Sequence, residues 1–237
     1  MIKIKIFKKI KDKFEIFIIT LAGKIKRQTV TQSLVSLKRK SLLSPDSAGL
    51  YTDKIRISAM ELCAHEIISN KIPGNVAEFG VYKGKFAAKI NEAFSDRDLY
   101  LFDSFNGFDP EQKKFDKNRG LLGNLGQDFF GVTIEEVMTK MKYPQNCIIK
   151  KGFFAQTTKG LEEDFSFVSI DADLYEAIKE GLEYFYPRLS KRGYIFVHDY
   201  NNENWAGVKK AIYEFCEQNS ISFTPLPDAH GTAVITK

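Results

Sequence analysis

Two apolar segments in the C-terminal half of the chain each end in side chains that can hold a metal ion or move a proton. Asp171 follows the first segment, at residues 167–170. His198 and Asp199 follow the second, at residues 194–197. A helix-length segment separates them, so the unit is predicted to be β-α-β with parallel strands, whose carboxyl ends bind ligands in open α/β sheets. We therefore expect Asp171 to lie close to His198 and Asp199 in space.

Each of these residues also has a simpler explanation. Asp173, before the helix-length segment, is a suitable N-cap for that helix. A His-Asp pair after a strand is often part of an ordinary loop. The joint position at strand ends that can be neighbours favours a catalytic or metal-binding site over both explanations.

The elements that must position these residues alternate along the chain. We predict helices at residues 52–70, 85–94, 134–141, 175–185 and 205–217, and strands at residues 76–79, 99–102, 147–149, 167–170, 194–197, 223–225 and 233–236. Thr133 and Glu136 form a capping box for the middle helix, and Arg192 and Gly193 are expected in a loop. The pattern predicts an α/β fold with a mostly parallel sheet, helices on both faces and a terminal hairpin.

The first predicted strand and turn, VAEFGVYKGKFA, has features of a cofactor site. Gly80 and Gly84 allow a tight turn and a close approach of the backbone to a ligand at a helix N-terminus. Their spacing matches neither the GxGxxG of dinucleotide folds nor the GxxxxGKS/T phosphate loop. Glu78 lies near the end of this strand, and Asp103 at the end of the next is placed to accept hydrogen bonds from ribose hydroxyls. These residues predict a nucleoside cofactor without a pyrophosphate, for which S-adenosylmethionine is the natural candidate.

The first 40 residues form a basic arm. They carry 12 Lys and Arg against two acids, which leaves a net charge of −5 for the remaining 197 residues out of the total of +5. This acidic body offers no basic groove for nucleic acid. Apolar residues of the arm follow the 3/4 spacing of an amphipathic helix, namely Phe7, Ile10, Phe14, Phe17, Leu21 and Ile25.

Two interpretations of the arm stay open. It packs on the body or on a second subunit, or it rests on an anionic membrane surface. Its longest apolar stretch, residues 16–22, is far shorter than the roughly 20 residues that span a bilayer, and Glu15 interrupts any signal-peptide core. Three cysteines without CxxC spacing, Cys63, Cys147 and Cys216, fit small core residues in a reducing compartment. We expect a cytoplasmic homo-oligomer, which in the second interpretation lies at the inner membrane surface.

The body, residues 41–237, is predicted to be one domain with two additions over its site. Residues 41–74 form a helical lid, and residues 104–131 form an insertion rich in glycine. Insertions of this length are lids, binding loops or disordered segments. The Phe, Lys and Arg content of the insertion suits a saccharide or a phosphorylated carrier.

Five segments, in order along the chain, resemble the macrocin and mycinamicin sugar O-methyltransferases. They are VAEFGVYKGKFA, LYLFDSFNGFD, KGFFAQTT, SFVSIDADLYEAIKEGLEYFYPRLSKRGYIFVHDYNN and GVKKAIYEF, and they run from about Asn75 to Phe215, roughly 60% of the chain. The resemblance implies a Rossmann-like class I methyltransferase fold, with a mostly parallel seven-stranded sheet and an antiparallel C-terminal strand. It also implies S-adenosylmethionine as methyl donor and a divalent cation, usually magnesium, that holds a sugar hydroxyl.

The resemblance assigns roles to individual residues. The cofactor site would contain Glu78, Phe79, Gly80 and Gly84 in the first turn, Asp103 and Ser104 at the ribose and adenine, Gly152 and Phe153 on the adenine side, and Asp171. The metal and catalytic positions would be Asp171, His198 and Asp199. The family often has two adjacent acids where this chain has His198-Asp199. Because magnesium prefers oxygen ligands and imidazole suits softer ions, His198 is either a ligand of such an ion or a base beside a metal held by Asp171 and Asp199.

We therefore expect an S-adenosylmethionine-dependent O-methyltransferase that acts on a sugar hydroxyl of a glycan, a nucleotide sugar or a glycosylated natural product. A bound cation would activate the hydroxyl, and Asp171 or His198 would take its proton. Two alternatives stay open, namely methylation of a small catechol-like acceptor and a non-catalytic scaffold that keeps the fold. Acids at four strand ends, Glu78, Asp103, Asp171 and Asp199, argue against the scaffold.

Overall fold

The computed structural model of the chain describes residues 54–123, 129–228 and 230–237. The predicted basic arm and the first part of the predicted lid lie outside these described residues. None of the helices in the described residues is long and apolar enough to cross a membrane.

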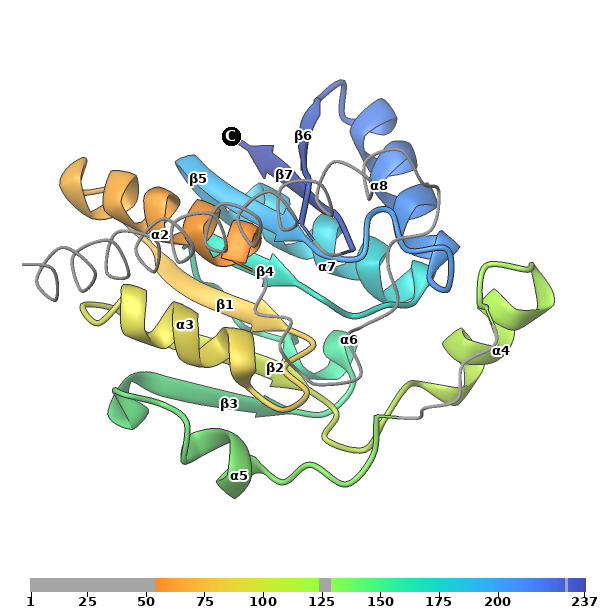
Figure 1. The fold of residues 1–237 in the computed structure, drawn as a ribbon, viewed down its shortest axis with the longest axis horizontal. Helices are drawn as coiled ribbons and strands as arrows, with labels where there is room; N and C mark the ends of the chain where they lie inside the picture. The colour runs from red at the N-terminus through yellow and green to blue at the C-terminus, as the bar shows by residue number, and fades with distance from the viewer. Residues whose placement is uncertain (1–53, 124–128, 229) are drawn as a thin grey trace, which may run out of the picture. The chain divides into compact units, whose positions relative to one another are not determined.

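The described residues form a seven-stranded sheet with the strand order β3-β2-β1-β4-β5-β7-β6 (Figure 1). The strands are β1 (Asn75–Phe79), β2 (Leu99–Asp103), β3 (Cys147–Lys151), β4 (Phe165–Ile170), β5 (Leu189–Val197), β6 (Phe223–Leu226) and β7 (Thr232–Thr236). Strands β1 to β5 pair in parallel, and β7 is antiparallel to both β5 and β6. The predicted fold class is confirmed. The strand order reverses between β1 and β4, and open α/β sheets bind ligands beside such a point.

Helices cover both faces of the sheet (Figure 1). They are α2 (Lys54–Ser69), α3 (Lys85–Ala93), α4 (Pro110–Asn118), α5 (Ile134–Met138), α6 (Phe154–Thr157), α7 (Tyr175–Arg188) and α8 (Ala206–Gln218), with a 3-10 turn at Pro144–Asn146. Met60 of α2 and Ile90 of α3 are buried in one core cluster with Phe167 of β4. Phe185 of α7 and Phe215 of α8 belong to the second cluster, on the other face. The two core clusters hold the strands in place, and the functional residues described below lie at the carboxyl ends of these strands.

The insertion after β2 contains a helix, α4, that we did not predict from the sequence. Asp109 caps it by accepting hydrogen bonds from the backbone N–H groups of Glu111 and Gln112, at 2.9 and 3.4 Å. Pro110 follows in the first helical turn, where proline is well tolerated. The signal was therefore present as an N-cap residue followed by proline. Asp116 of α4 is buried, and its Oδ2 accepts the backbone N–H of Tyr175 at 2.9 Å, which anchors the insertion to the start of α7.

Strand β5 begins before the predicted strand, at Leu189, so the expected loop at Arg192 and Gly193 is wrong. Pairing with β4 changes register there, and Arg192 has a φ of 70°, which is the geometry of a bulge. A Cβ atom at Gly193 would lie 2.8 Å from the backbone oxygen of Ser166. The glycine thus permits a close approach of two strands.

Two smaller predictions, on the middle helix and on the cysteines, are confirmed in part. The capping box of Thr133 and Glu136 is confirmed, although α5 ends at Met138 and is shorter than predicted. Of the cysteines, Cys216 is buried as expected, whereas Cys63 and Cys147 are half-buried.

Candidate active site

The carboxyl ends of β1, β2, β4 and β5 line a cleft of about 1070 Å³. All but one of the predicted site residues line it, namely Glu78, Phe79, Gly80, Asp103, Ser104, Gly152, Phe153, Asp171, His198 and Asp199. Gly84 does not line the cleft. It has a φ of 69° at the start of α3, and a Cβ atom there would lie 2.8 Å from Cγ1 of Val137. The absence of a side chain at Gly84 therefore allows the start of α3 to pack closely against α5.

The turn after β1 passes directly beside the end of β4. The backbone N–H of Asp171 donates to the oxygen of Phe79 at 2.7 Å. Gly80 has a φ of 88°, and a Cβ atom on it would lie 2.1 Å from the backbone oxygen of Asp171. No other residue type fits at this crossing. The crossing brings Glu78 and Asp171 into one cleft.

Asp103 holds the first turn in place. Its Oδ2 accepts the backbone N–H groups of Val81 and Tyr82 at 2.8 and 2.9 Å, and its Oδ1 accepts that of Phe105 at 2.7 Å. A carboxylate offers roughly four acceptor positions, so capacity remains for a ligand hydroxyl. Ser104 also shapes its own turn, because its hydroxyl oxygen accepts the N–H of Asn106 at 3.0 Å.

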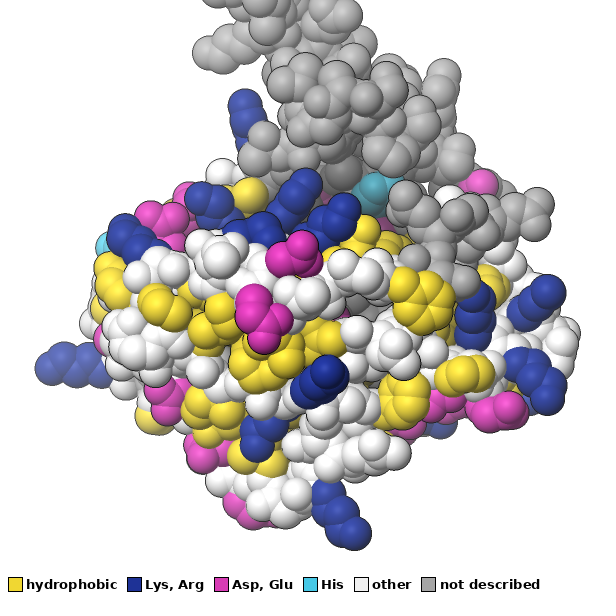
Figure 2. All heavy atoms as spheres, turned by 90° about the horizontal axis from the view of Figure 1, so that it is seen from below, with side chains coloured by type: hydrophobic (Ala, Val, Ile, Leu, Met, Phe, Trp, Pro, Cys, Tyr) yellow, Lys and Arg dark blue, Asp and Glu magenta, His cyan; other side chains and the backbone are white. Residues whose placement is uncertain are grey.

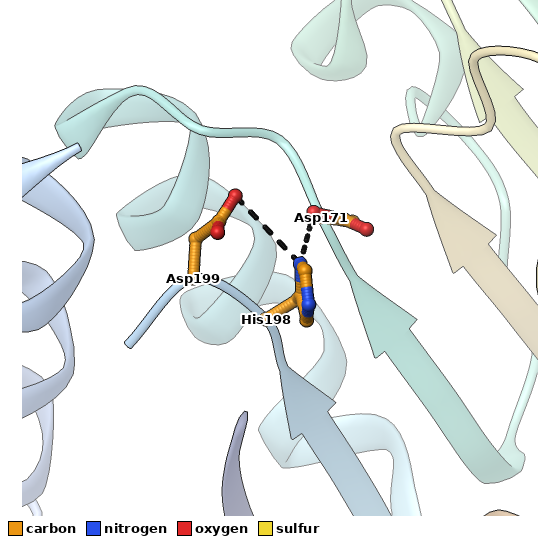
Figure 3. Close-up of side chains that lie close together, drawn as sticks. All are labelled: Asp171, His198 and Asp199. Carbon is orange, nitrogen blue, oxygen red and sulfur yellow. Dashed lines mark hydrogen bonds and ion pairs between the residues drawn. The ribbon is translucent and has the colours of Figure 1, made fainter. Parts of the chain in front are cut away.

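The side chains of Asp171, His198 and Asp199 meet at the ends of β4 and β5 (Figure 3). Nδ1 of His198 lies 3.1 Å from Oδ1 of Asp171 and 3.6 Å from Oδ2 of Asp199. One potential ligand atom from each residue lies within 4.8 Å of the others. The parallel arrangement of the two strands thus produces the convergence that the sequence predicted.

Arg56 of α2 also enters this cluster, and the sequence analysis missed it. Its guanidinium donates to Oδ2 of Asp171 at 3.0 Å and to the hydroxyl of Ser169 at 2.9 Å, and it lies over the ring of Phe86 at 3.9 Å. Arg56 is only 4% exposed. It occupies the buried stripe of α2 one helical repeat before Met60, and an arginine on such an apolar stripe was the available signal.

Burial and charge shift the acids and the histidine of the cluster in different directions. Burial raises the pKa of Glu78 well above its ordinary value. Burial also opposes ionisation of Asp171, but the charges of His198 and Arg56 outweigh it and lower the pKa of Asp171. Burial and Arg56 disfavour the imidazolium of His198, yet Asp171 and Asp199 outweigh them and raise the pKa of His198 well above its usual range. The lowered pKa of Asp171 makes its carboxylate a weaker base, and the raised pKa of His198 favours the protonated form of its imidazole.

Asp173 is not the N-cap of α7, contrary to the simpler explanation of this residue. Leu174 occupies the cap position, and the first N–H of the helix is bound by Asp116. Asp173 has a φ of 62°, lines the cleft and shares a side-chain hydrogen bond with Asp199. Burial and the charges of Asp199 and Asp171 raise its pKa. Non-glycine residues with positive φ cost free energy and cluster at functional sites, so Asp173 belongs to the site.

The insertion contributes an aromatic wall to the cleft. The ring of Phe108 lies 5.3 Å from that of Phe129 and 5.4 Å from that of Trp205, and Tyr82 meets Phe129 at 4.9 Å. The pairing of Leu122 with Trp205 ties the insertion to the segment before α8. Polar side chains line the same cleft, namely Asp109, Gln112, Glu180, Asn202 and Asn204. This side of the cleft is neither purely polar nor a flat aromatic slot.

Lysines also line the cleft, from the turn before α3, from α3 itself and after α5. They are Lys83, Lys85, Lys89 and Lys140. Figure 2, which views the molecule from below, shows several Lys and Arg side chains together near the upper edge of that face, with hydrophobic side chains scattered below them.

Replacing Arg56 by methionine should lower the free energy of unfolding by about 3–5 kcal/mol, because it leaves the Asp171 carboxylate without its buried partner. Binding of S-adenosylhomocysteine should weaken in parallel, since Glu78 and Asp171 then repel each other. Calorimetry and guanidinium unfolding measure both quantities.

Arg97 provides a matched control at the other end of the sheet, where it donates to the backbone oxygens of Ile72 and Gly74. Arg97→Met should reduce stability without changing affinity for the cofactor product, and equal loss of affinity in both variants would contradict the assignment.

Comparison with known proteins places these features in context. A family model described as macrocin-O-methyltransferase (TylF) matches residues 3–237. A tetracenomycin-C 4'-O-methyltransferase from Streptomyces olivaceus, whose full name places a dimethoxy-rhamnosyl group on its substrate, is 25% identical over 76% of this chain and 71% of its own length. The mycinamicin III 3''-O-methyltransferase of Micromonospora griseorubida is 26% identical over 70% of each chain.

Solved structures share the fold. The O-methyltransferase NovP superposes with a TM-score of 0.63 at 22% identity, over 77% of this chain and 79% of that one. The calicheamicin methyltransferase CalS11 gives a TM-score of 0.62 at 17% identity, over 88% of this chain and 92% of that one.

Proposed function

Because this chain belongs to the macrocin-O-methyltransferase (TylF) family, we propose that it methylates a hydroxyl of a sugar carried by a natural product. Its fold is that of the class I methyltransferases, and it is an S-adenosylmethionine-dependent O-methyltransferase. The observation that carries the proposal is the convergence of two half-sites in one cleft. The turn from Glu78 to Gly80 forms one half, and the cluster of Asp171, His198 and Asp199 forms the other.

The turn after β1 suits the methyl donor. Gly80 lines the cleft beside Glu78, whose acid is buried with its Oε2 unpaired among the described residues. Such an acceptor fits an ammonium or hydroxyl donor of a ligand, because an unmade buried hydrogen bond is costly. Asp103, Ser104, Gly152 and Phe153 continue this half of the cleft and are proposed to hold the ribose and adenine.

We propose a divalent cation at Asp171, His198 and Asp199. The donor set fits, because two carboxylates and an imidazole lie within 4.8 Å of one another. An all-oxygen set would favour magnesium, whereas the imidazole extends the range to ions such as manganese or iron. When bound, such an ion supplies Lewis-acid polarisation of the acceptor oxygen.

We assign the general base to Asp173. From the sequence, Asp171 and His198 were the two candidates for the general base. In the structure their side chains bond to each other. Both oxygens of Asp171 are bonded, one to Arg56 and the other to His198. Asp173 instead lines the cleft and shares a hydrogen bond with Asp199, and we propose that it reaches an acceptor hydroxyl held at the cluster. A positioned base contributes about 10²–10⁴-fold to a proton-transfer step, and correct orientation of the acceptor toward the methyl group contributes further.

The aromatic wall guides the choice of acceptor. Phe108, Phe129 and Trp205 offer apolar faces, and Asn202 and Asn204 offer polar groups beside them. A sugar that carries an apolar aglycone can use both kinds of contact. This arrangement supports a glycosylated natural product over a free polysaccharide chain.

The experiment that tests the function is methyl transfer from labelled S-adenosylmethionine to a panel of glycosylated macrolides, nucleotide sugars and catechols. We expect transfer to a sugar hydroxyl, and we expect removal of metal with EDTA to lower the rate at least about 100-fold. Magnesium or manganese should restore it. Full turnover in EDTA would reject the metal, and transfer only to catechols would reject the sugar acceptor.

The basic arm at residues 1–40 lies outside the described residues, and we propose that it contacts an anionic membrane surface. The full chain should sediment with vesicles containing phosphatidylserine at low salt and leave them as salt screens the lysines. A variant that lacks residues 1–40 should lose this binding and keep its affinity for S-adenosylhomocysteine. Absence of vesicle binding, together with loss of a dimer on truncation, would instead support packing between subunits.

A further inference from the structure

Asp228 is a buried acid that the reaction as described above does not use. It lies between β6 and β7, and its side chain is 0% exposed. Its Oδ2 accepts the hydroxyl of Thr232 at 2.6 Å, whereas its Oδ1 has no hydrogen-bond partner among the described residues. Burial of a carboxylate with one oxygen unsatisfied is costly. A buried acid of this kind is therefore a candidate for a functional role.

The imidazole of His198 lies close to this acid. Oδ2 of Asp228 lies 3.8 Å from Nε2 of His198. The other ring nitrogen, Nδ1, faces Asp171 and Asp199 (Figure 3). The imidazole thus lies between the acid cluster on one side and Asp228 on the other.

Backbone hydrogen bonds fix the position of Asp228 relative to β5. The N–H of Tyr200 donates to the oxygen of Gly231 at 2.9 Å, and the N–H of Asn201 donates to that of His230 at 3.0 Å. The turn that carries Asp228 is therefore fastened to the segment that directly follows His198.

We propose that Asp228 is a positioning residue that receives the Nε2–H of His198 and thereby presents Nδ1 to the metal cluster. Histidines that bind metals commonly donate their second ring N–H to a carboxylate, which fixes the tautomer and the ring orientation. The 3.8 Å separation is longer than a hydrogen bond, and we expect it to shorten to one when a metal occupies the cluster, as catalytic hydrogen bonds often do when a site is filled. The inference rests on the proposed metal site. It also explains how an imidazole can serve there, because an oxygen ligand at position 198 would need no such partner.

Manganese binding, measured by calorimetry on the full chain, tests the proposal without reference to activity. Asp228→Asn and Asp228→Ala should weaken the affinity by about 10–100-fold, while the affinity for S-adenosylhomocysteine stays within about threefold. Asp116→Asn is the matched control, because Asp116 is also a buried aspartate with one unpaired oxygen among the described residues, but it lies on α4. Its manganese affinity should equal that of the parent. A loss as large as that of Asp228→Asn would overturn the proposal.

A double-variant cycle separates positioning from a merely structural role. In the His198→Asp background the ligand is a carboxylate with no second N–H, so Asp228→Asn should change manganese affinity by less than about threefold. The same loss in both backgrounds would mean that Asp228 acts through the fold, and the proposal would fall.

Histidine NMR provides a readout that is independent of metal affinity. The chain has three histidines, so single substitutions of His65 and His230 assign the signals of His198. We expect a slowly exchanging Nε2–H of His198 in the parent and its loss in Asp228→Ala. If the parent transfers methyl groups but binds no manganese, the proposed metal fails and this signal still decides the role of Asp228. An Nε2–H that is unchanged in Asp228→Ala would refute it.

Discussion

Asp173→Asn should lower kcat by about 10²–10⁴-fold, which is the usual contribution of a general base. The substitution keeps the size of the side chain and removes its ability to take a proton. The affinities for S-adenosylhomocysteine and manganese should stay within about threefold, because neither the first turn nor the metal cluster loses a ligand. Initial rates with saturating acceptor, together with calorimetry, measure these quantities.

Glu176→Gln is a matched control for this variant. Glu176 lies three residues further along, in the first turn of α7, and does not line the cleft. Its substitution removes the same charge and should leave kcat within about threefold. An unchanged kcat in Asp173→Asn would reject this residue as the base and return the role to His198 or Asp171.

Asp171→Asn should abolish most turnover and also destabilise the protein. We expect at least a 100-fold fall in rate, since the substitution removes a charge that both the metal and the acceptor oxygen need. We also expect the free energy of unfolding to fall by about 3–5 kcal/mol, because Arg56 stays buried without its partner. The combination of both losses distinguishes Asp171 from Asp173, which should affect rate alone.

The pH dependence of this loss of stability has a defined sign. The pKa of Asp171 is lowered in the folded state, so its stabilising contribution is present above the unfolded pKa and is lost as the pH falls. The difference between parent and variant should therefore shrink below about pH 4. Guanidinium unfolding at several pH values measures it.

Two variants serve as controls for Asp171→Asn. Asp96 pairs with Arg97 at the surface, with its side chain 51% exposed, so Asp96→Asn should cost less than about 1 kcal/mol. Adding Arg56→Met to Asp171→Asn should cost less than the sum of the single losses, because both members of the pair are then gone. Strict additivity would contradict a direct interaction.

The sequence predicted the fold and the core of the site because both depend on periodic patterns and strand ends. Asp171, His198 and Asp199 were found since parallel strands must bring their carboxyl ends to one edge of the sheet. The helix found at residues 54–69 was predicted at residues 52–70, but its arginine was not assigned a role. A long-range pair such as Arg56 with Asp171 spans 115 residues and leaves no local signature.

The roles that the sequence did not indicate depend on contacts between segments that only the tertiary structure brings together. Asp173 has the residue type of an N-cap, yet Asp116 from the insertion binds the first N–H of α7 in its place. Asp103 is predicted to bind ribose, and it also accepts three backbone N–H groups, a second role that the sequence did not indicate. For Asp173 and for two of the three partners of Asp103, the partner group lies in another segment, so spacing within one segment does not report it.

The hydrogen bond from Tyr175 to Asp116 sets a limit on engineering this enzyme. Tyr175 begins α7 two residues after Asp173, so the insertion that walls the acceptor also supports the loop that carries the proposed base. A change in the insertion that alters which acceptor binds is therefore expected to alter the catalytic rate as well. An insertion transplanted from a relative to change substrate range would have to bring an acceptor at the position of Asp116, or the gain in range would be offset by a slower reaction.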